Sequence, residues 1–379
     1  MRPVELLIPA SSLEVLKIAV IYGADAVYIG GEVFGLRAKA KNFSMEDMAE
    51  GIQFAHEHGV KVYVTANILA HNGDLEGVRE YFTQLKEIKP DALIISDPGI
   101  YTIAKEICPE IERHISTQAN NTNYGTYQFW WNQGAKRVVT ARELSLNEIA
   151  EIRKNIPDEM EIETFVHGAM CISYSGRCLL SNYFTGRDAN QGACTHPCRW
   201  KYAVMEESRP GEYLPVYENE RGTFIFNSKD LCMLEHIPDL LDAGIDSFKI
   251  EGRMKTPEYA AGVVSIYRKY MDSYLDGSRI PVEKKDIRAL LELGNRGGFT
   301  NGYYYHHNDS DMLSGESASH NKSEGVLQDN IRREYVDTEL KEKIKGKLIL
   351  NKECPAKIEV QYGKIKVSYQ GDMVLVAQN

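Results

Sequence analysis

Four of the seven cysteines lie within the 28 residues from Cys171 to Cys198. Their spacing is Cys171-x6-Cys178-x15-Cys194-x3-Cys198, in a stretch rich in glycine and polar residues. Thiolates gathered in one loop are typical ligands of a soft metal centre, either zinc or an iron–sulfur cluster. Zinc sites usually contain Cys-x-x-Cys pairs, which this loop lacks, whereas the four thiolates of a cube-shaped cluster need no tight pairs. We therefore expect an iron–sulfur cluster of the 4Fe-4S type, with zinc as the alternative.

Two further interpretations concern the same thiols. A disulfide would require an oxidising compartment. The apolar stretch at the N-terminus is too short and too soon acidic for a signal peptide. We therefore expect a cytoplasmic protein with reduced thiols. Cys232 is an alternative fourth ligand. It lies at the start of a predicted helix, 231–243, where the helix dipole would lower the pKa of a thiol.

Glu163 and His167 are candidates for proton transfer. Both lie on a predicted strand, 162–167, and alternation places residues 163, 165 and 167 on one face. A buried glutamate needs a partner, for which Arg142 and Lys249 are candidates, and a purely structural ion pair is the alternative to catalysis. His167 could donate a proton, bind substrate or form a hydrogen bond with the sulfur ligands.

Polar side chains also follow several predicted strands. Lys249, Glu251 and Arg253 end the last of them, and three other candidates follow earlier strands: Asn67, Gln118 and Arg142. Arginine and lysine at such positions can bind a carboxylate or a phosphate, arginine in bidentate fashion. The alternative is a ring of ion pairs that only closes the barrel. We expect these residues to bind a small anionic cosubstrate.

The elements that position these residues alternate between strand and helix. Eight strands are predicted at 5–9, 26–30, 61–67, 92–96, 113–118, 137–140, 162–167 and 247–251. Several intervening helices end at a glycine that leads into the next strand, and no Gly-x-Gly-x-x-Gly follows the first strand. This pattern predicts an α/β fold, a (β/α)8 TIM-like barrel, whose active residues lie at the C-terminal ends of the strands.

The barrel is predicted to span residues 1–305 and to include a cysteine-rich insertion, 169–230, after the seventh strand. Within that insertion 213–217 and 223–227 could pair as a hairpin, and 295–305 reads as an ordered loop. Residues 306–324 form a predicted linker. Alternating strands at 347–351, 356–362, 364–369 and 373–377 indicate a small, incomplete β-barrel-like domain from 325 to 379.

Composition limits the partners. The net charge of −10 argues against general coating of nucleic acids, and no apolar run approaches the roughly 18 residues of a membrane helix. Aromatic and basic residues nevertheless mix within the insertion, around Arg177, Tyr183, Phe184, Arg187, Arg199 and Trp200. Such a mixture suits an extruded single-stranded base, although a loop that packs its own aromatic residues is the simpler explanation.

The cysteine region resembles the collagenase-like peptidase family U-32. That family's signature is matched at every defined position, namely Glu163, Phe165, Gly168, Ala169, Met170, Cys171, Gly176, Cys178, Leu180 and Ser181. The resemblance extends from Leu6 to Gly302 and is strongest to a branch that hydroxylates transfer RNA. It implies an iron–sulfur enzyme that forms 5-hydroxyuridine at the tRNA wobble position.

The resemblance also implies prephenate as the anionic cosubstrate and Cys198 as the fourth ligand, and it suggests a partner chain of the same family. A collagenase-like endopeptidase is the rival function. A hydroxylase of ribosomal RNA or of a quinone precursor, or a scaffold that depends on a partner, is a third interpretation.

Overall fold

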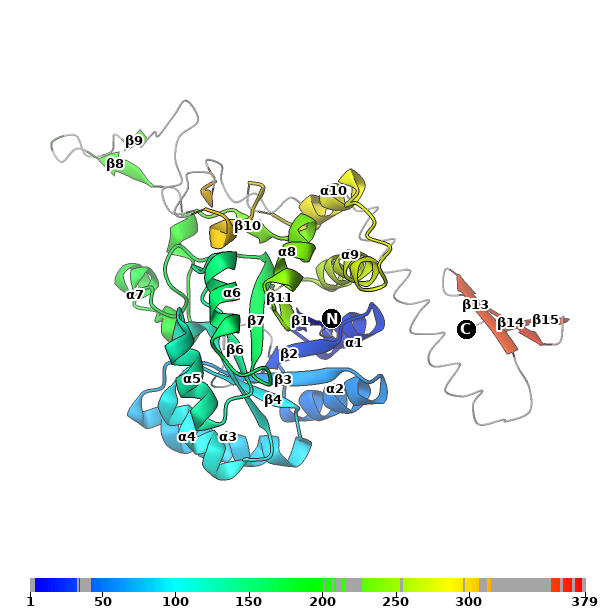
Figure 1. Cartoon of the computed structure of the whole chain (residues 1–379), viewed down its shortest axis with the longest axis horizontal. Helices are drawn as coiled ribbons and strands as arrows, with labels where there is room; N and C mark the ends of the chain where they lie inside the picture. The colour runs from blue at the N-terminus through cyan, green and yellow to red at the C-terminus, as the bar shows by residue number, and fades with distance from the viewer. Residues whose placement is uncertain are drawn as a thin grey trace.

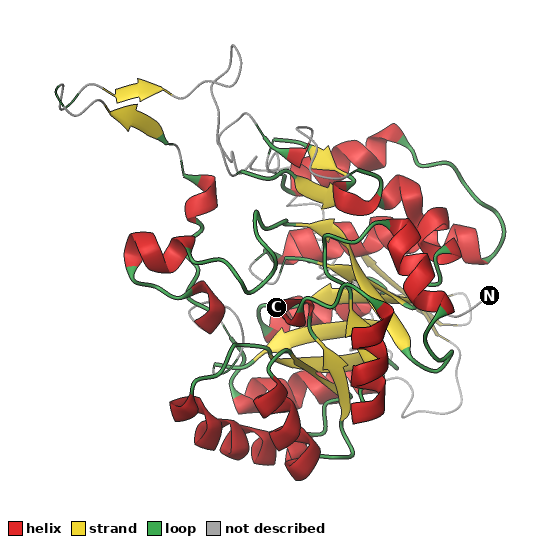
Figure 2. Cartoon of the chain, turned by 60° about the vertical axis from the view of Figure 1, so that its left-hand side comes forward, coloured by secondary structure: helices red, strands yellow, loops and turns green. Residues whose placement is uncertain are grey.

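The computed structural model describes residues 4–32, 34, 42–200, 202–205, 208, 211, 213–215, 227–252, 255–295, 297–306, 312–314, 356–361, 364–369 and 372–376. Its centre is a closed barrel of eight parallel strands, surrounded by helices (Figures 1 and 2). The barrel strands are β1 (Glu5–Pro9), β2 (Ala26–Gly30), β3 (Lys61–Ala66), β4 (Ala92–Ile95), β5 (Glu112–Ile115), β6 (Arg137–Val139), β7 (Glu161–Gly168) and β11 (Ser247–Ile250).

Strand β11 closes the barrel because it pairs with β1 on one side and with β7 on the other. Three residues of β11 are in register with both neighbours; Ser247, for example, lies opposite Glu5 of β1 and opposite Glu163 of β7. The predicted (β/α)8 barrel is confirmed, and each of its eight predicted strands overlaps an observed one. Strands β2 and β4 read as continuous apolar runs because parallel strands in a barrel are buried on both faces.

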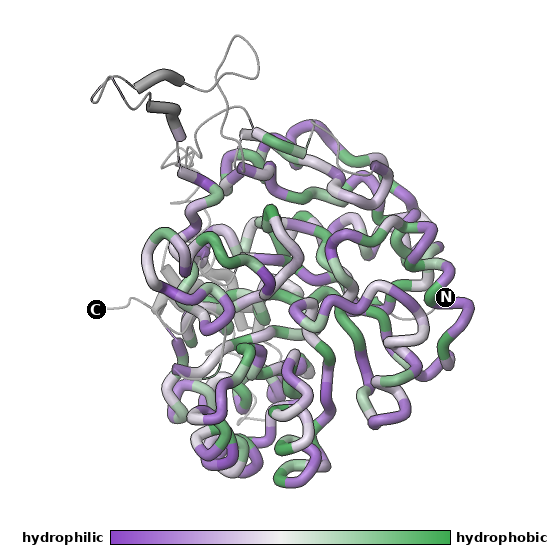
Figure 3. Tube along the Cα trace, turned by 90° about the vertical axis from the view of Figure 1, so that its left-hand side faces the viewer, coloured by the Kyte–Doolittle hydropathy of each residue, from purple (hydrophilic) through white to green (hydrophobic). Residues whose placement is uncertain are grey.

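Several helices of the outer layer begin at side-chain caps. Ser44 Oγ accepts a hydrogen bond from Asp47 N at 3.1 Å, and Ser145 forms a capping box with Glu148. The trace in Figure 3 alternates between hydrophobic and hydrophilic colours along these helices, since one side of each packs on the barrel. They are α1 (Leu13–Ile21), α2 (Met45–Glu57), α3 (Leu75–Ile88), α4 (Pro98–Ile107), α5 (Tyr124–Gln133), α6 (Leu146–Lys154), α8 (Ile237–Asp242), α9 (Pro257–Leu275) and α10 (Lys284–Leu293).

The predicted helix 231–243 is wrong in its first part. Residues Asp230–Cys232 form strand β10, which runs antiparallel to the end of β7, with Leu231 opposite Gly168. A short 3-10 turn, η5 (Leu234–His236), follows, and α8 begins only at Ile237, where Pro238 occupies the first turn. Long-range strand pairing therefore overrides the helical pattern, and Cys232 lies in a strand.

The insertion after β7 contains α7 (Leu180–Thr185), η3 (Ala189–Gln191) and η4 (Pro197–Arg199). Its hairpin pairs β8 (Ala203–Met205) with β9 (Tyr213–Pro215). The predicted strand 213–217 therefore overlaps β9 but pairs with an earlier segment, and the predicted partner 223–227 lies almost wholly outside the described residues. The predicted loop 295–305 contains β12 (Phe299–Thr300), which pairs with β10, and η6 (Gly302–Tyr304).

Near the C-terminus, β13 (Ala356–Gln361), β14 (Lys364–Tyr369) and β15 (Asp372–Val376) form an antiparallel sheet. They match three of the predicted strands, whereas 347–351 and most of the predicted linker 306–324 lie outside the described residues. The division into a barrel and a small β-barrel-like domain remains a prediction. Among the helices that the structure describes, none is both long enough and apolar enough to cross a membrane.

Candidate functional site

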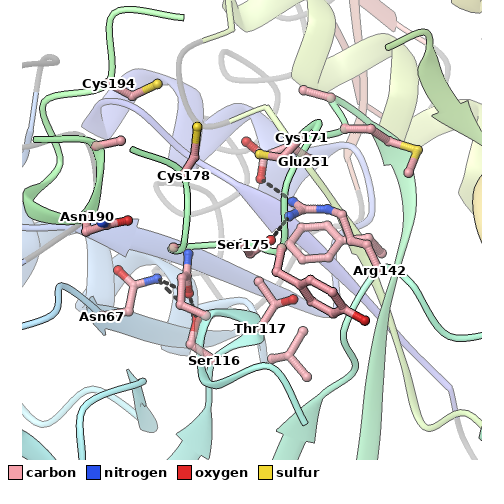
Figure 4. A pocket seen from close by; sticks show the side chains of 18 of the residues that line it. Asn67, Ser116, Thr117, Arg142, Cys171, Ser175, Cys178, Asn190, Cys194 and Glu251 are labelled. Carbon is pink, nitrogen blue, oxygen red and sulfur yellow. Dashed lines mark hydrogen bonds and ion pairs between the residues drawn. The ribbon is translucent and has the colours of Figure 1, made fainter. Parts of the chain in front are cut away.

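A pocket lies at the C-terminal ends of the barrel strands and is shared with the cysteine loop (Figure 4). Its wall includes Asn67 after β3, Gln118 after β5 and Arg142 after β6. Lys249 and Glu251 contribute from β11 and the residues after it. The barrel therefore brings five of the six predicted substrate-binding residues together, and the sixth, Arg253, lies outside the described residues.

Three of the four predicted cysteine ligands line this pocket, namely Cys171, Cys178 and Cys194. Cys198 lies close by in η4, and the four thiols influence one another electrostatically. Burial raises the pKa of both Cys194 and Cys198, and the neighbouring thiols raise each further. None of the six cysteines that the structure describes forms a disulfide.

The cysteine thiols meet the demands of the two kinds of metal centre to different degrees. In the described part of the chain, no group of three or more His, Cys, Asp or Glu side chains is placed around a single metal ion. A cube-shaped cluster makes a different demand, because each of its four thiolate ligands binds a different iron atom. Four mutually interacting thiols on one loop fit that demand in chemistry and number.

Glycine and asparagine hold the cysteine loop against the barrel. Gly176 has a left-handed φ of +72°, and a Cβ there would lie 2.9 Å from Gln118 Cγ. Asn120 Nδ2 donates to Ser175 O at 3.0 Å, and Asn120 Oδ1 accepts from Arg177 Nε at 2.8 Å. The loop after β5 thus positions the residues between Cys171 and Cys178.

The second half of the cysteine loop is attached to the segment after β3. Leu69 N donates to Asn190 O at 3.2 Å, and the side-chain amide of Gln191 donates to Leu69 O. These contacts lie just before Cys194. Two separate barrel loops therefore determine where the two pairs of cysteines lie.

Arg142 is the principal cation on the pocket wall. Its Nη1 donates to Ser175 Oγ at 2.6 Å, and its Nη2 lies 3.5 Å from Glu251 Oε2. The guanidinium lies 3.9 Å from the centre of the Phe165 ring, and the side chain is 9% exposed. These contacts hold the guanidinium in one orientation, as bidentate binding of a carboxylate requires.

Opposite the charged residues, the wall carries a group of amides and hydroxyls. Asn67 Nδ2 donates to Ser116 Oγ at 3.2 Å and to Gln118 Oε1 at 3.1 Å, and the Ser116 hydroxyl donates to the same amide oxygen. This network orients Asn67 and Gln118 toward each other. Amide groups of this kind can bind hydroxyl or carbonyl groups of a ligand.

Glu163 lies below the pocket in a buried ion-pair network. Its carboxylate accepts from Lys249 Nζ at 2.5 Å and from Arg137 Nη1 at 3.1 Å, and the residue is 0% exposed. Burial raises the pKa of Glu163, but the charges of Lys249 and Arg137 outweigh it and hold the pKa below its usual value. The predicted partner Lys249 is confirmed. Arg142 pairs with Glu251 instead, and the proton-transfer role of Glu163 stays a prediction.

His167 does not share a face with Glu163 and Phe165, so that prediction was wrong. The register between β7 and β11 shifts after Phe165. Phe165 lies opposite Lys249, but the next residue of β11 lies opposite His167, so β7 contains one extra residue at this point. The imidazole packs against rings of α9, with its Nδ1 3.4 Å from Tyr267 Oη. Burial lowers the pKa of His167 to about 3, and the charge of Lys255 contributes. A neutral imidazole outside the pocket gives no geometric support to the predicted catalytic role.

Cys232 differs from the helix-start thiol that the sequence predicted. It lies opposite His167 in the β10–β7 pair, and its Sγ is 3.9 Å from Tyr267 Oη. Burial raises the pKa of Cys232 to about 11, whereas a helix N-terminus would have lowered it. It is not among the residues that line the pocket.

Sequence reasoning missed Ser175 as a residue that positions the site. Ser175 lies between two cysteines, so its position gave a signal. The stacking of Arg142 on Phe165 had no local signal, because the two residues are 23 positions apart and meet only through the barrel.

A β/α barrel with convergent polar side chains and thiols at its C-terminal end has the architecture of an enzyme. The chain matches the model of peptidase family U32 over residues 11–314, and it belongs to that family.

Relatives in this family are named for RNA hydroxylation. The chain is 46% identical to tRNA hydroxylation protein P1 of Bacillus subtilis (strain 168), over 77% of this chain and 69% of the relative. It is 41% identical to tRNA hydroxylation protein P of Escherichia coli (strain K12), over 82% and 77% respectively. It is 38% identical to the 23S rRNA 5-hydroxycytidine C2501 synthase of Escherichia coli (strain K12), over 72% and 40%. These names support a hydroxylase role within the family.

Proposed function

We propose that this protein is an enzyme that hydroxylates a transfer-RNA uridine at the wobble position, giving 5-hydroxyuridine. The relatives named for tRNA hydroxylation support this substrate, since they are 46% and 41% identical over most of both chains. The observation that carries the proposal is the shared pocket, in which three cysteines of the loop lie beside Arg142 and the amides of Asn67 and Gln118.

The proposed cofactor is a 4Fe-4S cluster held by Cys171, Cys178, Cys194 and Cys198. Such a cluster supplies one-electron redox chemistry when it is bound. The chain itself provides a loop that two barrel segments hold in place, and thiols with no disulfide among those described. Zinc on the same thiols is the alternative.

The charged side of the pocket is proposed to bind an anionic cosubstrate such as prephenate, a dicarboxylate. Arg142, oriented by Ser175, Glu251 and Phe165, would bind one carboxylate through two parallel hydrogen bonds. Lys249 lines the same pocket and adds positive charge, although Glu163 pairs with it from below. Arg253 is proposed to contribute from the segment after β11. The predicted partner chain of the same family is also retained as a proposal.

Metal analysis of protein purified without oxygen tests the cofactor. A cluster predicts brown protein, broad absorption in the blue part of the visible spectrum, and about four iron and four sulfide per chain. Cys171→Ser should remove most of the iron, whereas Cys108→Ser, in a buried thiol outside the loop, should retain it. Colourless protein that contains stoichiometric zinc would refute the cluster.

Nucleoside analysis of a deletion strain tests the substrate. Loss of 5-hydroxyuridine from tRNA, restored by the wild-type chain and not by Arg142→Ala, is the expected result. If the deletion leaves tRNA unchanged but alters ribosomal RNA, the substrate would instead be ribosomal RNA, as in the relative named for 23S rRNA. Peptide hydrolysis by the purified chain, with RNA unaffected, would favour the peptidase activity in the family's name.

A further inference from the structure

Three aromatic side chains of the cysteine insertion are exposed together. They are Tyr183 and Phe184 on α7 and Trp200 directly after η4, and they are 82%, 46% and 40% exposed. We call this set the aromatic platform. Figures 1 and 2 both draw α7 at the side of the barrel, outside its ring of helices. Exposed aromatic residues that gather in this way are characteristic of a binding surface.

The rings of the platform contact one another. The centres of Tyr183 and Phe184 are 5.3 Å apart with a near-perpendicular angle of 78°, and those of Phe184 and Trp200 are 5.8 Å apart. Phe184 therefore links two outer rings whose faces and edges remain accessible. Tyr183 in particular leaves most of its ring in water, which is unfavourable for an aromatic side chain without a partner.

The charge around the platform has the opposite sign to that of the whole chain. From Gly168 to Trp200 the sequence contains three arginines and one acidic residue, Asp188, whereas the whole chain carries −10. Arg177 and Arg187 are exposed, and Arg187 lies three positions after Phe184. A local excess of arginine on an acidic protein favours a polyanionic ligand at this surface.

The platform adjoins, along the chain, residues that line the pocket. Trp200 directly follows Arg199, which lines the pocket, and α7 begins two residues after Cys178, which also lines it. A strand of nucleic acid that lies on the platform can therefore place one of its bases in the pocket. A duplex would first have to unstack and unpair one of its bases, which costs free energy that an unpaired strand does not lose.

We propose that the aromatic platform binds single-stranded RNA, with Tyr183 and Trp200 stacking on unpaired bases that flank the nucleotide in the pocket and Arg187 contacting a phosphate. Aromatic rings interleaved with arginine suit single-stranded RNA because every base offers a π face, whereas side chains cannot read the deep groove of an RNA duplex. This inference rests on the proposed function and adds the surface that holds the RNA beside the pocket.

Binding of a fluorescently labelled tRNA anticodon stem–loop to the full chain tests the proposal. Stacking of one base on one ring predicts that Tyr183→Ala weakens binding by about fivefold to a hundredfold, and that Tyr183→Phe, which keeps the ring, binds like the wild type. Trp200→Ala should weaken binding within the same range. Phe129→Ala is the matched control, because Phe129 is also an exposed aromatic residue, 53% exposed, but lies on α5.

The salt dependence of RNA affinity distinguishes the contribution of Arg187 from that of the aromatic rings. Removing one phosphate contact to a single strand lowers the slope of log affinity against log salt concentration by about 0.7, so Arg187→Ala should show that change. Tyr183→Ala should leave the slope as it is in the wild type, because stacking releases no counterions. A fully paired RNA of the same sequence should bind Tyr183→Ala and the wild type equally weakly.

Two results would overturn the inference. One is a Tyr183→Ala variant that binds the stem–loop and restores 5-hydroxyuridine in cells as well as the wild type does, which leaves the proposed function standing. The other is a Tyr183→Ala variant with normal RNA affinity but a smaller assembly mass in solution, which would assign the platform to a contact between protein chains. A wild-type chain that neither binds RNA nor restores the nucleoside would refute the proposed function itself.

Discussion

Glu5 at the base of the barrel gives a sharp test of how the interior charges stabilise the fold. Its carboxylate accepts hydrogen bonds from Arg137 Nη1 at 2.5 Å, from Tyr63 Oη at 2.6 Å and from Ser247 Oγ at 2.8 Å. The four residues come from four strands: β1, β3, β6 and β11. Replacing Glu5 with glutamine keeps the shape of the side chain and removes its charge.

The size of the effect follows from the pKa of Glu5. Burial raises this pKa, but the charge and hydrogen bonds of Arg137 and the other two donors lower it from 4.5 to about 2. At about 1.4 kcal/mol for each pH unit, the difference corresponds to about 3 kcal/mol of stability. The folded pKa is the lower one, so this stability is fully present above pH 4.5 and is lost as the pH falls from 4.5 to about 2.

The measurement is the free energy of unfolding in urea, for wild type and Glu5→Gln, at several pH values between 7 and 2.5. We expect the variant to be about 3 kcal/mol less stable at pH 7 and the difference to shrink toward zero at the acid end. Glu106→Gln is the matched control, because Glu106 pairs with Arg79 at 3.1 Å on the surface and should change stability by less than about 1 kcal/mol.

A constant difference between wild type and Glu5→Gln at every pH would refute the reasoning, because it would show that the effect does not come from ionisation of Glu5. A loss at pH 7 no larger than that of Glu106→Gln would do the same. The denaturant dependence of the unfolding free energy should be equal in the three proteins, so that the comparison concerns stability alone.

Three further predictions concern the site. Gly176→Ala should lower both stability and iron content, because its Cβ would meet Gln118. Gly186→Ala is the control, since Gly186 has a similar left-handed φ but a Cβ there would have nothing within 4 Å. This control should lose only about 1 kcal/mol of folding stability and should keep its iron. Arg142→Lys should raise the KM for an anionic cosubstrate by about tenfold, because lysine loses the bidentate geometry and the stacking on the ring. Stability is measured in parallel, and an unchanged KM would contradict this prediction. The ring protons of His167 should show no titration between pH 5 and 8 by NMR, because burial keeps its imidazole neutral down to a pKa of about 3; a midpoint near 6.5 would place the ring in solvent.

Local patterns in the sequence were sufficient to predict the barrel and the cysteine loop. Strand β2 is an uninterrupted apolar run, and α6 begins at the capping box of Ser145 and Glu148, so each element is encoded within its own few residues. Gly176 likewise carries its own signal, since a turn between two cysteines that needs a positive φ favours glycine. Alternation of such elements leaves few arrangements other than a closed barrel.

Only the tertiary structure decided which side chains meet. Cys232 follows a helical pattern, but pairing of β10 with β7 places it in a strand and gives its thiol a raised pKa. His167 leaves the face of Glu163 because one extra residue enters β7 where it pairs with β11. Arg137 of β6 pairs with Glu163 of the neighbouring strand β7 and also with Glu5 of β1, a strand that does not pair with β6. These outcomes depend on strand register and on contacts between residues distant in sequence, and the free energy of those contacts exceeds the local preferences on which sequence patterns rest.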